Sequence, residues 1–145
     1  MIKINPYLIF NGDTEEALNF YKSIFGGELE SLQRFKDVPR EDQEAGHFDK
    51  KEDEKIINVG LTVGENGLMA GDAPNSMPIK MGENFFLSLE VDSKDDADKF
   101  FTGLSEGGKI NMGLGDTFWG AYYGMLRDKF GIGWMVNYTY PTLTK

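Results

Sequence analysis

Side chains suited to metal binding or nucleophilic catalysis are scarce in this chain of 145 residues, which has no cysteine and a single histidine, His47. Without cysteine there are no disulfides, no thiol catalysis and no thiolate metal sites. His47 lies in the charged segment 36–55, which we interpret as a solvated loop or lid. A lone loop histidine is usually only exposed. Its neighbour Phe48 is a candidate lid residue, because long loops beside a site can close over ligands.

Aromatic residues gather in the stretch 115–138, which contains both tryptophans. Aromatic and β-branched residues predict two strands here, joined at 128–131. Glycines at 120, 124, 131 and 133 leave gaps beside the large side chains, where a bend, a bulge or a ligand fits. The stretch is therefore the first place to look for a ligand site.

Composition narrows the classes of partner. The net charge is −9, which argues against nucleic acid and anionic membranes, since phosphate binding needs clustered Lys and Arg. This charge mildly favours a cationic ligand, although an acidic surface commonly serves only solubility. No apolar run is long enough to span a bilayer, and residues 1–10 show no signal-peptide pattern. We expect a cytoplasmic protein.

Hydrophobic periodicity and turn residues predict the order strand, helix, strand, strand, strand, occurring twice. The expected elements of the first half are strand 3–10, a helix from 13 or 14 to 25, and strands 29–35, 55–63 and 68–72. Those of the second half are strand 84–91, a helix beginning at Ser93, and strands 109–114, 117–127 and 132–138.

The two halves repeat one plan. A shift of 80 residues superimposes the helices, pairing Ala17 with Ala97, and extends to the preceding strands, where it pairs Pro6 with Phe86. A shift of 64 superimposes the last strands and pairs Gly71 with Met135. Such a repeat indicates one supersecondary unit used twice.

Two tandem βαβββ units are the architecture of the vicinal oxygen chelate superfamily, which includes glyoxalase I, extradiol dioxygenases and bleomycin-resistance proteins. YLIFNGDTEEALNFYKSIFGGE at 7–28 and DTFWGAYYGMLRDKFGIGWMVN at 116–137 resemble the two signatures of its PhnB-like branch. GDAP at 71–74 fits the family segment between the modules. The resemblance implies an α+β fold whose two modules form a curved mixed sheet. It implies one domain, 1–145, with module one at about 1–75, a linker at about 73–83 and module two at about 84–145.

The resemblance implies that, in metal-using members, the first and last strands of each module supply one metal ligand each. These places fall at or next to Pro6, Gly71, Phe86 and Met135. None of them binds a hard or borderline divalent ion, because methionine sulfur is too soft and the others offer no ligand. A slip of one residue brings in Asn5 or Asp72, which still does not complete a site. We therefore expect neither a metal nor another cofactor.

Strand alternation assigns a cup wall if Pro6, Phe86 and Met135 face inward. For the strand 117–127, either Trp119 and Tyr123 or Phe118 and Tyr122 face the cup, and we favour the first pair. The predicted ligand-binding residues, apolar with a few polar groups, are Leu8, Phe10, Phe48, Phe86, Ser88, Glu90, Trp119, Tyr123, Met125, Arg127, Met135 and Asn137. Equally, these aromatics could close the cup as ordinary core.

Glu90 is the candidate catalytic residue. A carboxylate desolvated in an aromatic cup would have a raised pKa and could act as a general base. It could equally bind a cation, pair with Arg127 or simply be exposed near the end of its strand.

Three functions stay open. The first is a non-catalytic protein that holds a small aromatic or cationic molecule in a metal-free, aromatic-lined cup. The second is a divergent enzyme of the same superfamily, lyase or dioxygenase-like, that acts on a small metabolite. The third is a structural or regulatory dimer whose cup is filled by its own side chains. Family members usually pair modules within or between chains, so a homodimer is expected.

Overall fold

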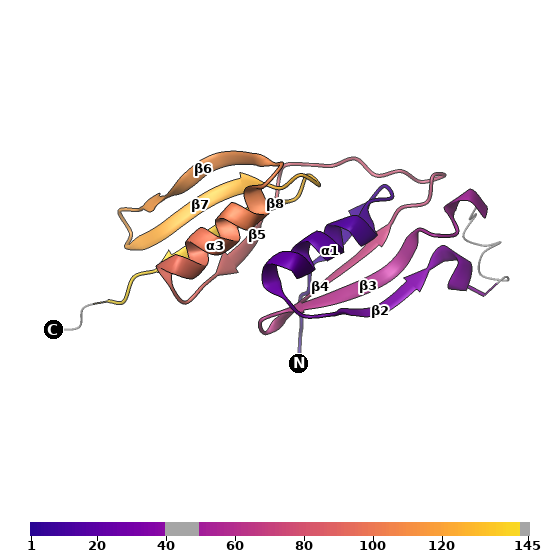
Figure 1. Cartoon of the computed structure of the whole chain (residues 1–145), viewed down its shortest axis with the longest axis horizontal. Helices are drawn as coiled ribbons and strands as arrows, with labels where there is room; N and C mark the ends of the chain where they lie inside the picture. Colours follow the sequence, from indigo (N-terminus) through magenta and orange to yellow (C-terminus); the bar gives the residue numbers. More distant parts are fainter. Residues whose placement is uncertain (40–49, 143–145) are drawn as a thin grey trace. The chain divides into compact units, whose positions relative to one another are not determined.

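The computed structural model describes residues 1–39 and 50–142. Two compact units make up the chain, Met1–Lys80 and Met81–Lys145, and each is described by itself. The same element order, βαβββ, occurs in both (Figure 1). The predicted α+β fold of two tandem modules is confirmed. The division between the units falls within the stretch 73–83.

The first unit is a four-stranded mixed sheet in the order β1-β4-β3-β2. Only the β1–β4 pair is parallel, and the other pairs are antiparallel. Its elements are β1 (Tyr7–Phe10), α1 (Thr14–Phe25), β2 (Leu29–Arg34), β3 (Ile56–Val63) and β4 (Asn66–Asp72), with short 3-10 turns at Phe35–Asp37 and Lys50–Glu52.

The second unit has the equivalent order β5-β8-β7-β6, with β5 parallel to β8. Its elements are β5 (Leu87–Glu90), α3 (Lys94–Ser105), β6 (Lys109–Asp116), β7 (Ala121–Arg127) and β8 (Gly133–Thr139). The predicted cap of its helix is present, since the Asp96 amide donates to Ser93 Oγ at 3.0 Å. Such a cap satisfies one of the free amides of the first turn.

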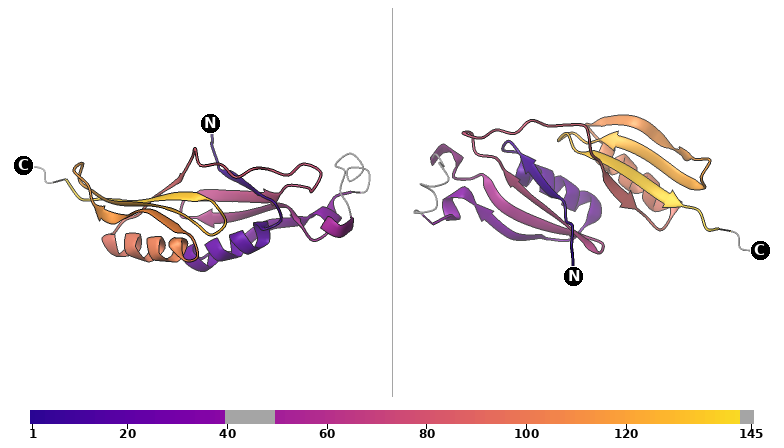
Figure 2. Two further views of the ribbon diagram at one scale, coloured as in Figure 1. Left: turned by 90° about the horizontal axis from the view of Figure 1, so that it is seen from above. Right: turned by 180° about the vertical axis from the view of Figure 1, so that it is seen from behind.

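One helix covers one face of each sheet, and no helix covers the other face (Figure 2). The apolar stripe of α1 supplies Leu18 and Tyr21 to the core, and that of α3 supplies Phe101 and Leu104; all four are buried. We call the sheet face opposite the helix the open face.

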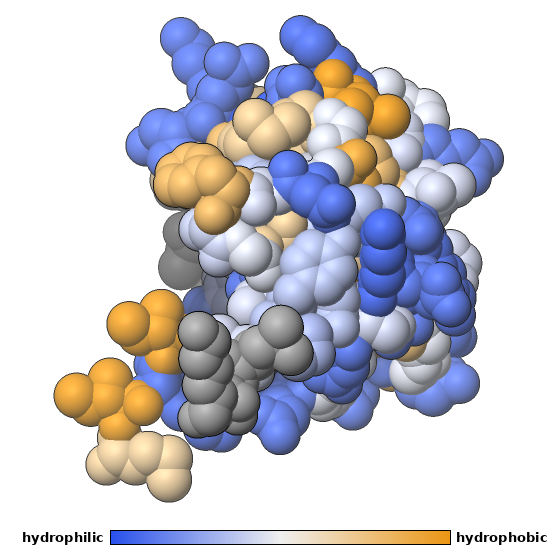
Figure 3. Space-filling model, turned by 90° about the vertical axis from the view of Figure 1, so that its left-hand side faces the viewer, coloured by the Kyte–Doolittle hydropathy of each residue, from blue (hydrophilic) through white to orange (hydrophobic). Residues whose placement is uncertain are grey.

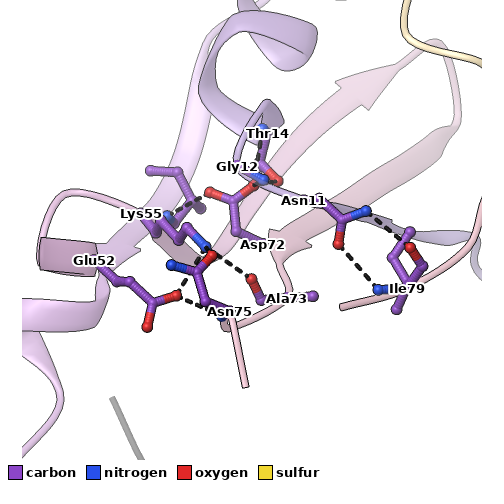
Figure 4. Close-up of polar contacts among 10 residues, drawn as sticks. Asn11, Gly12, Thr14, Glu52, Lys55, Asp72, Ala73, Asn75 and Ile79 are labelled. Carbon is purple, nitrogen blue, oxygen red and sulfur yellow. Dashed lines mark hydrogen bonds and ion pairs between the residues drawn. The ribbon is translucent and has the colours of Figure 1, made fainter. Parts of the chain in front are cut away.

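Buried carboxylates fasten the loops of both units. Asp72 Oδ1 accepts from the Gly12 and Thr14 amides, each at 3.0 Å, and from Thr14 Oγ1 at 2.6 Å. Its Oδ2 accepts from the Ile56 amide at 2.9 Å. Figure 4 shows this carboxylate between the start of α1 and β3. It satisfies backbone donors that would otherwise be buried without partners.

Asp128 accepts hydrogen bonds in the same way in the turn between β7 and β8. Its Oδ1 accepts from the amides of Phe130 and Ile132, at 2.9 and 3.0 Å, and its Oδ2 accepts from Trp134 Nε1 at 2.9 Å. The hairpin predicted at 128–131 is thus a turn closed around one buried side chain.

The repeat is present, but the shift of the first strands is 79 residues. The shift of 64 between the last strands matches Ala70 to Trp134. Ala70 pairs with Leu8 and Trp134 pairs with Leu87, so Leu8 corresponds to Leu87. The helices keep their shift of 80, because α1 begins at Thr14 and α3 at Lys94. Counted from the register-matched positions Leu8 and Leu87, the helix of the second module therefore begins one residue later.

This offset of one residue reverses which side chains of the first strand point toward the helix, since side chains alternate with period two. Leu8 and Phe10 are buried on the face that α1 covers, whereas Tyr7 and Ile9 are exposed on the open face. The prediction that Leu8 and Phe10 line a cup was wrong. Tyr7, rather than Pro6, stands where Phe86 stands in the second module.

Candidate functional site

The candidate site is the open face of the second sheet. On β7, Tyr122 donates to Asp98 of α3 at 2.5 Å. A Cβ added at Gly124 would lie 2.8 Å from the Phe101 ring of the same helix. These two positions face the helix, so their neighbours Tyr123 and Met125 face the open side. Of the two alternatives for this strand, the structure adopts the one with Tyr123, and Tyr122 packs toward α3.

Strand register orders the open face into three rows that run across the sheet. We name them the acceptor row, Glu90, Asn137 and Tyr123; the methionine row, Ser88, Met135, Met125 and Met112; and the arginine row, Phe86, Gly133, Arg127 and Lys109. Phe86 precedes β5 and joins its row through contact with Gly133. Successive rows are two residues apart along β5, β7 and β8, or roughly 7 Å, whereas β6 advances by three residues because its register shifts.

In the acceptor row, Asn137 Nδ2 donates to both oxygens of Glu90, at 3.0 and 2.9 Å. It also donates to Thr139 Oγ1 at 3.1 Å. Glu90 is exposed rather than enclosed in an aromatic cup. The carboxylate is held in a fixed orientation by a neutral neighbour.

Arg127 occupies the opposite end and is bound to its own turn. Its Nη1 donates to the Gly131 carbonyl at 2.8 Å and to the Gly82 carbonyl at 3.4 Å. The guanidinium carbon lies 5.2 Å from the centroid of the Phe86 ring, in a cation–π contact. Arg127 therefore does not pair with Glu90, which settles one of the alternatives raised for that carboxylate.

An aromatic cluster lies beside the acceptor row. Trp119 contacts Tyr123 edge to face, with ring centroids 5.8 Å apart, and contacts Phe118 at 5.0 Å. Phe118 is 98% exposed. The turn that carries both rings is closed by bonds between Thr117 and Ala121, including Thr117 N to Ala121 O at 2.8 Å. Figure 3 shows apolar residues standing at the surface among charged ones.

The open face of the first sheet is arranged differently, because Tyr7 lies across Gly71. A Cβ added at Gly71 would lie 2.7 Å from both Tyr7 Oη and the Ile57 carbonyl oxygen. Tyr7 Oη donates to that carbonyl at 3.1 Å. Although the ring is partly exposed, desolvation of its hydroxyl, and to a lesser extent the nearby Asp72 charge, raises the pKa of Tyr7 above its ordinary value. The hydroxyl is thus retained as a donor.

The positions that would hold a family-type metal can now be placed with the corrected register. They are Tyr7, Gly71, Phe86 and Met135. The Tyr7 hydroxyl is bonded to a carbonyl, glycine and phenylalanine offer no ligand, and methionine sulfur is too soft for Mg²⁺, Mn²⁺ or Fe²⁺. These side chains do not fit such an ion. Within residues 1–39 and 50–142, no three His, Cys, Asp or Glu side chains gather in a metal-binding group.

A buried ion pair in the first unit was missed at the sequence level, where segment 36–55 was interpreted as solvated. Lys55 Nζ donates to Glu52 Oε1 and Asn75 Oδ1, each at 2.8 Å, and to the Ala73 carbonyl at 3.2 Å (Figure 4). Glu52 is 3% exposed. The three protons of the ammonium are all used, so this cluster fastens the segment after β4. The i, i+3 spacing of Glu52 and Lys55 was its only sequence signal.

The remaining predicted site residue, Phe48, lies outside the described residues, as does His47. Those that the structure brings together on one face are Phe86, Ser88, Glu90, Tyr123, Met125, Arg127, Met135 and Asn137, with Trp119 against Tyr123.

Paired βαβββ units, each with one sheet face left bare, define the class of protein. The chain belongs to the Glyoxalase/Bleomycin resistance protein/Dioxygenase superfamily, whose family model matches residues 3–136.

Individual relatives cover nearly the whole chain. Protein PA1353 from Pseudomonas aeruginosa is 41% identical, with a TM-score of 0.85 over 96% of this chain and 98% of its own. A PhnB protein from Bacillus cereus is 25% identical, with a TM-score of 0.73 over 95% and 100%. Protein YjdN of Escherichia coli is 29% identical over 139 residues, covering 92% of this chain and 93% of its own. In the part of the chain that the structure describes, no helix is both long and apolar enough to cross a membrane.

Proposed function

We propose that this chain binds a small molecule on the open face of its second sheet, without catalysing a reaction. The observation that carries the proposal is the ordering of that face into polar, methionine and arginine rows beside an exposed Trp119. Flexible, polarisable methionine side chains adapt to varied apolar ligands. Apolar walls with a few convergent polar groups are typical of small-molecule sites.

Binding is favoured over catalysis by the state of Glu90, the single carboxylate of the three rows. It is exposed, and its hydrogen bonds come from the Asn137 amide. Active sites usually exclude water from around a general base, and an exposed carboxylate lacks that enclosure. The superfamily's name covers enzymes as well as a resistance protein, so a divergent enzyme is the second candidate. Glu90→Gln would abolish turnover in that case and leave binding intact.

A bare sheet face also favours pairing of modules, and we propose a cytoplasmic homodimer. Tyr7 and Ile9 stand exposed on the first open face, and Met112 on the second. Exposed apolar faces of this kind are usually covered in the working assembly. Light scattering should give twice the chain mass of 16.3 kDa. A monomer at micromolar concentration would contradict the dimer and, with it, the third candidate of a dimer whose face is filled by its own side chains.

The test of binding is a thermal-shift screen with a broad, drug-rich library, repeated on two variants. Met135→Lys places a charge at the centre of the methionine row and should remove the shift produced by any hit. Met77→Lys adds the same charge at a position that is exposed in the first unit and should leave the shifts unchanged. The proposal fails if no compound raises the melting temperature, or if both variants behave alike.

A further inference from the structure

The acceptor row carries a negative charge without a counterion. Among the described residues, the Glu90 carboxylate is contacted by Asn137 Nδ2, and no Lys or Arg nitrogen forms an ion pair with it. The cations of the same face belong to the arginine row, four residues away along β8. That separation is about 13 Å, which is beyond direct pairing. Glu90 is therefore free to receive a cation from a ligand.

Asn137 adds a second acceptor at the same place. Its amide nitrogen must face Glu90, since a carbonyl oxygen there would be repelled by the carboxylate. The same nitrogen also donates to Thr139. Its Oδ1 oxygen then has no protein partner in the described part of the chain. A group with several N–H donors can bond Glu90 and Asn137 together.

Aromatic rings complete this end of the face. Tyr123 is the cross-strand neighbour of Asn137, and Trp119 packs against Tyr123. Faces of aromatic rings attract cations, most strongly when water is excluded. The adjoining methionine row offers apolar area one step, about 7 Å, further along the strands. The face thus presents a carboxylate, an amide oxygen and an aromatic ring across the sheet, with thioethers in the next row along the strands.

We propose that the ligand class of this site is a protonated organic amine with an apolar or aromatic body, selected by Glu90 and Asn137. The ammonium bonds the two acceptors beside the aromatic cluster, and the body lies along Met135 and Met125. This inference rests on the proposed binding function and goes beyond it by naming the ligand chemistry and the residues that discriminate.

The experiment measures the affinity of three probes of matched shape by calorimetry: 4-phenylbutylamine, 4-phenylbutan-1-ol and 4-phenylbutanoate. The wild type should bind the amine about tenfold more tightly than the alcohol, as a charge-assisted hydrogen bond provides. The carboxylate probe should bind most weakly. A higher salt concentration should lower the affinity for the amine and leave the affinity for the alcohol unchanged, because exposed charges are screened.

Two variants with equal change in net charge locate the effect. Glu90→Gln keeps the size and the bond from Asn137 and should reduce amine affinity about tenfold, with alcohol affinity unchanged. Glu65→Gln, in the exposed turn before β4, should alter neither. Equal binding of amine and alcohol to the wild type, or equal behaviour of the two variants, overturns the amine preference alone. If none of the three probes binds at millimolar concentration, the binding function is rejected as well.

Discussion

Replacing Asp72 by asparagine should destabilise the first unit by about 2–4 kcal/mol. The wild-type carboxylate accepts four hydrogen bonds, three on Oδ1 and one on Oδ2. An asparagine carbonyl can keep the three bonds from Gly12 and Thr14. The amide nitrogen must then face the Ile56 N–H, which is left buried without an acceptor.

The magnitude follows from two terms. An unsatisfied buried donor costs about 1–3 kcal/mol. The three retained bonds lose the ionic component that makes charge-assisted bonds roughly twice as strong as neutral ones, which adds about 1 kcal/mol. Loss of a negative charge at the start of α1 acts in the same direction, through the helix dipole.

Asp13→Asn is the matched control. Asp13 occupies the N-cap of α1 without a side-chain capping bond and is exposed, so its substitution removes the same charge from the same helix end. We expect less than about 1 kcal/mol for this variant. Urea unfolding gives the free energies, and amide hydrogen exchange at Ile56 reports the local loss. The reasoning is refuted if the two variants are equally stable, or if Ile56 exchanges no faster in Asp72→Asn.

The remaining predictions concern an aromatic contact, a tyrosine and a helix cap. Gly71→Ala should destabilise the first unit by about 1–3 kcal/mol, since the added methyl meets both the Tyr7 hydroxyl and the Ile57 carbonyl. Combining it with Tyr7→Ala in urea unfolding should cost less than the two single changes summed, because the contact with the hydroxyl is removed while that with the carbonyl remains. A hydrogen bond to Asp116 raises the pKa of Tyr140 from 10.0 to about 12, so its contribution to stability is complete below pH 10 and is lost as the pH rises through about 12. In an ultraviolet titration, Asp116→Asn should therefore move one tyrosine back toward its ordinary pKa, and an unchanged curve would contradict this. Ser93→Ala should lower the melting temperature through the loss of about 1 kcal/mol of capping, whereas unchanged stability would show that the cap is dispensable.

Periodicity and turn residues were sufficient to predict the element order, because both helices have strong apolar stripes and the hairpins carry glycine at their turns. They could not fix the facing of β1. A strand of four residues, Tyr7–Phe10, is apolar at every position, so alternation gave no preference for either side. The helix shift of 80 was then extended to a strand whose true shift is 79.

The buried polar contacts were also beyond sequence reasoning, since they join residues far apart in the chain. Asp72 meets Gly12 and Thr14 across 60 and 58 positions, and Glu52 meets the Asn75 amide across 23. Nothing in the local pattern distinguishes these carboxylates from the exposed ones around them. In contrast, β7 and β8 were expected as strands from their aromatic and β-branched residues, although the predicted strand 117–127 began too early, because residues 117–120 form the turn before β7.

The two modules share a plan but differ in where an aromatic ring lies on the open face. In the first, Tyr7 lies across Gly71 and is bonded to Ile57, so the ring itself fills the position that the repeat assigns to Met135. In the second, the corresponding aromatic, Phe86, lies on Gly133 and is held there by Arg127. In each module one aromatic ring therefore packs on one glycine. The repeat matches Gly71 to position 135, so the two glycines are offset by two residues. That difference leaves Met135 and the acceptor row beyond it uncovered in the second sheet alone. Binding of the amine that we propose should accordingly depend on β5, β7 and β8, and exchange of those strands with a relative should transfer the preference for the amine.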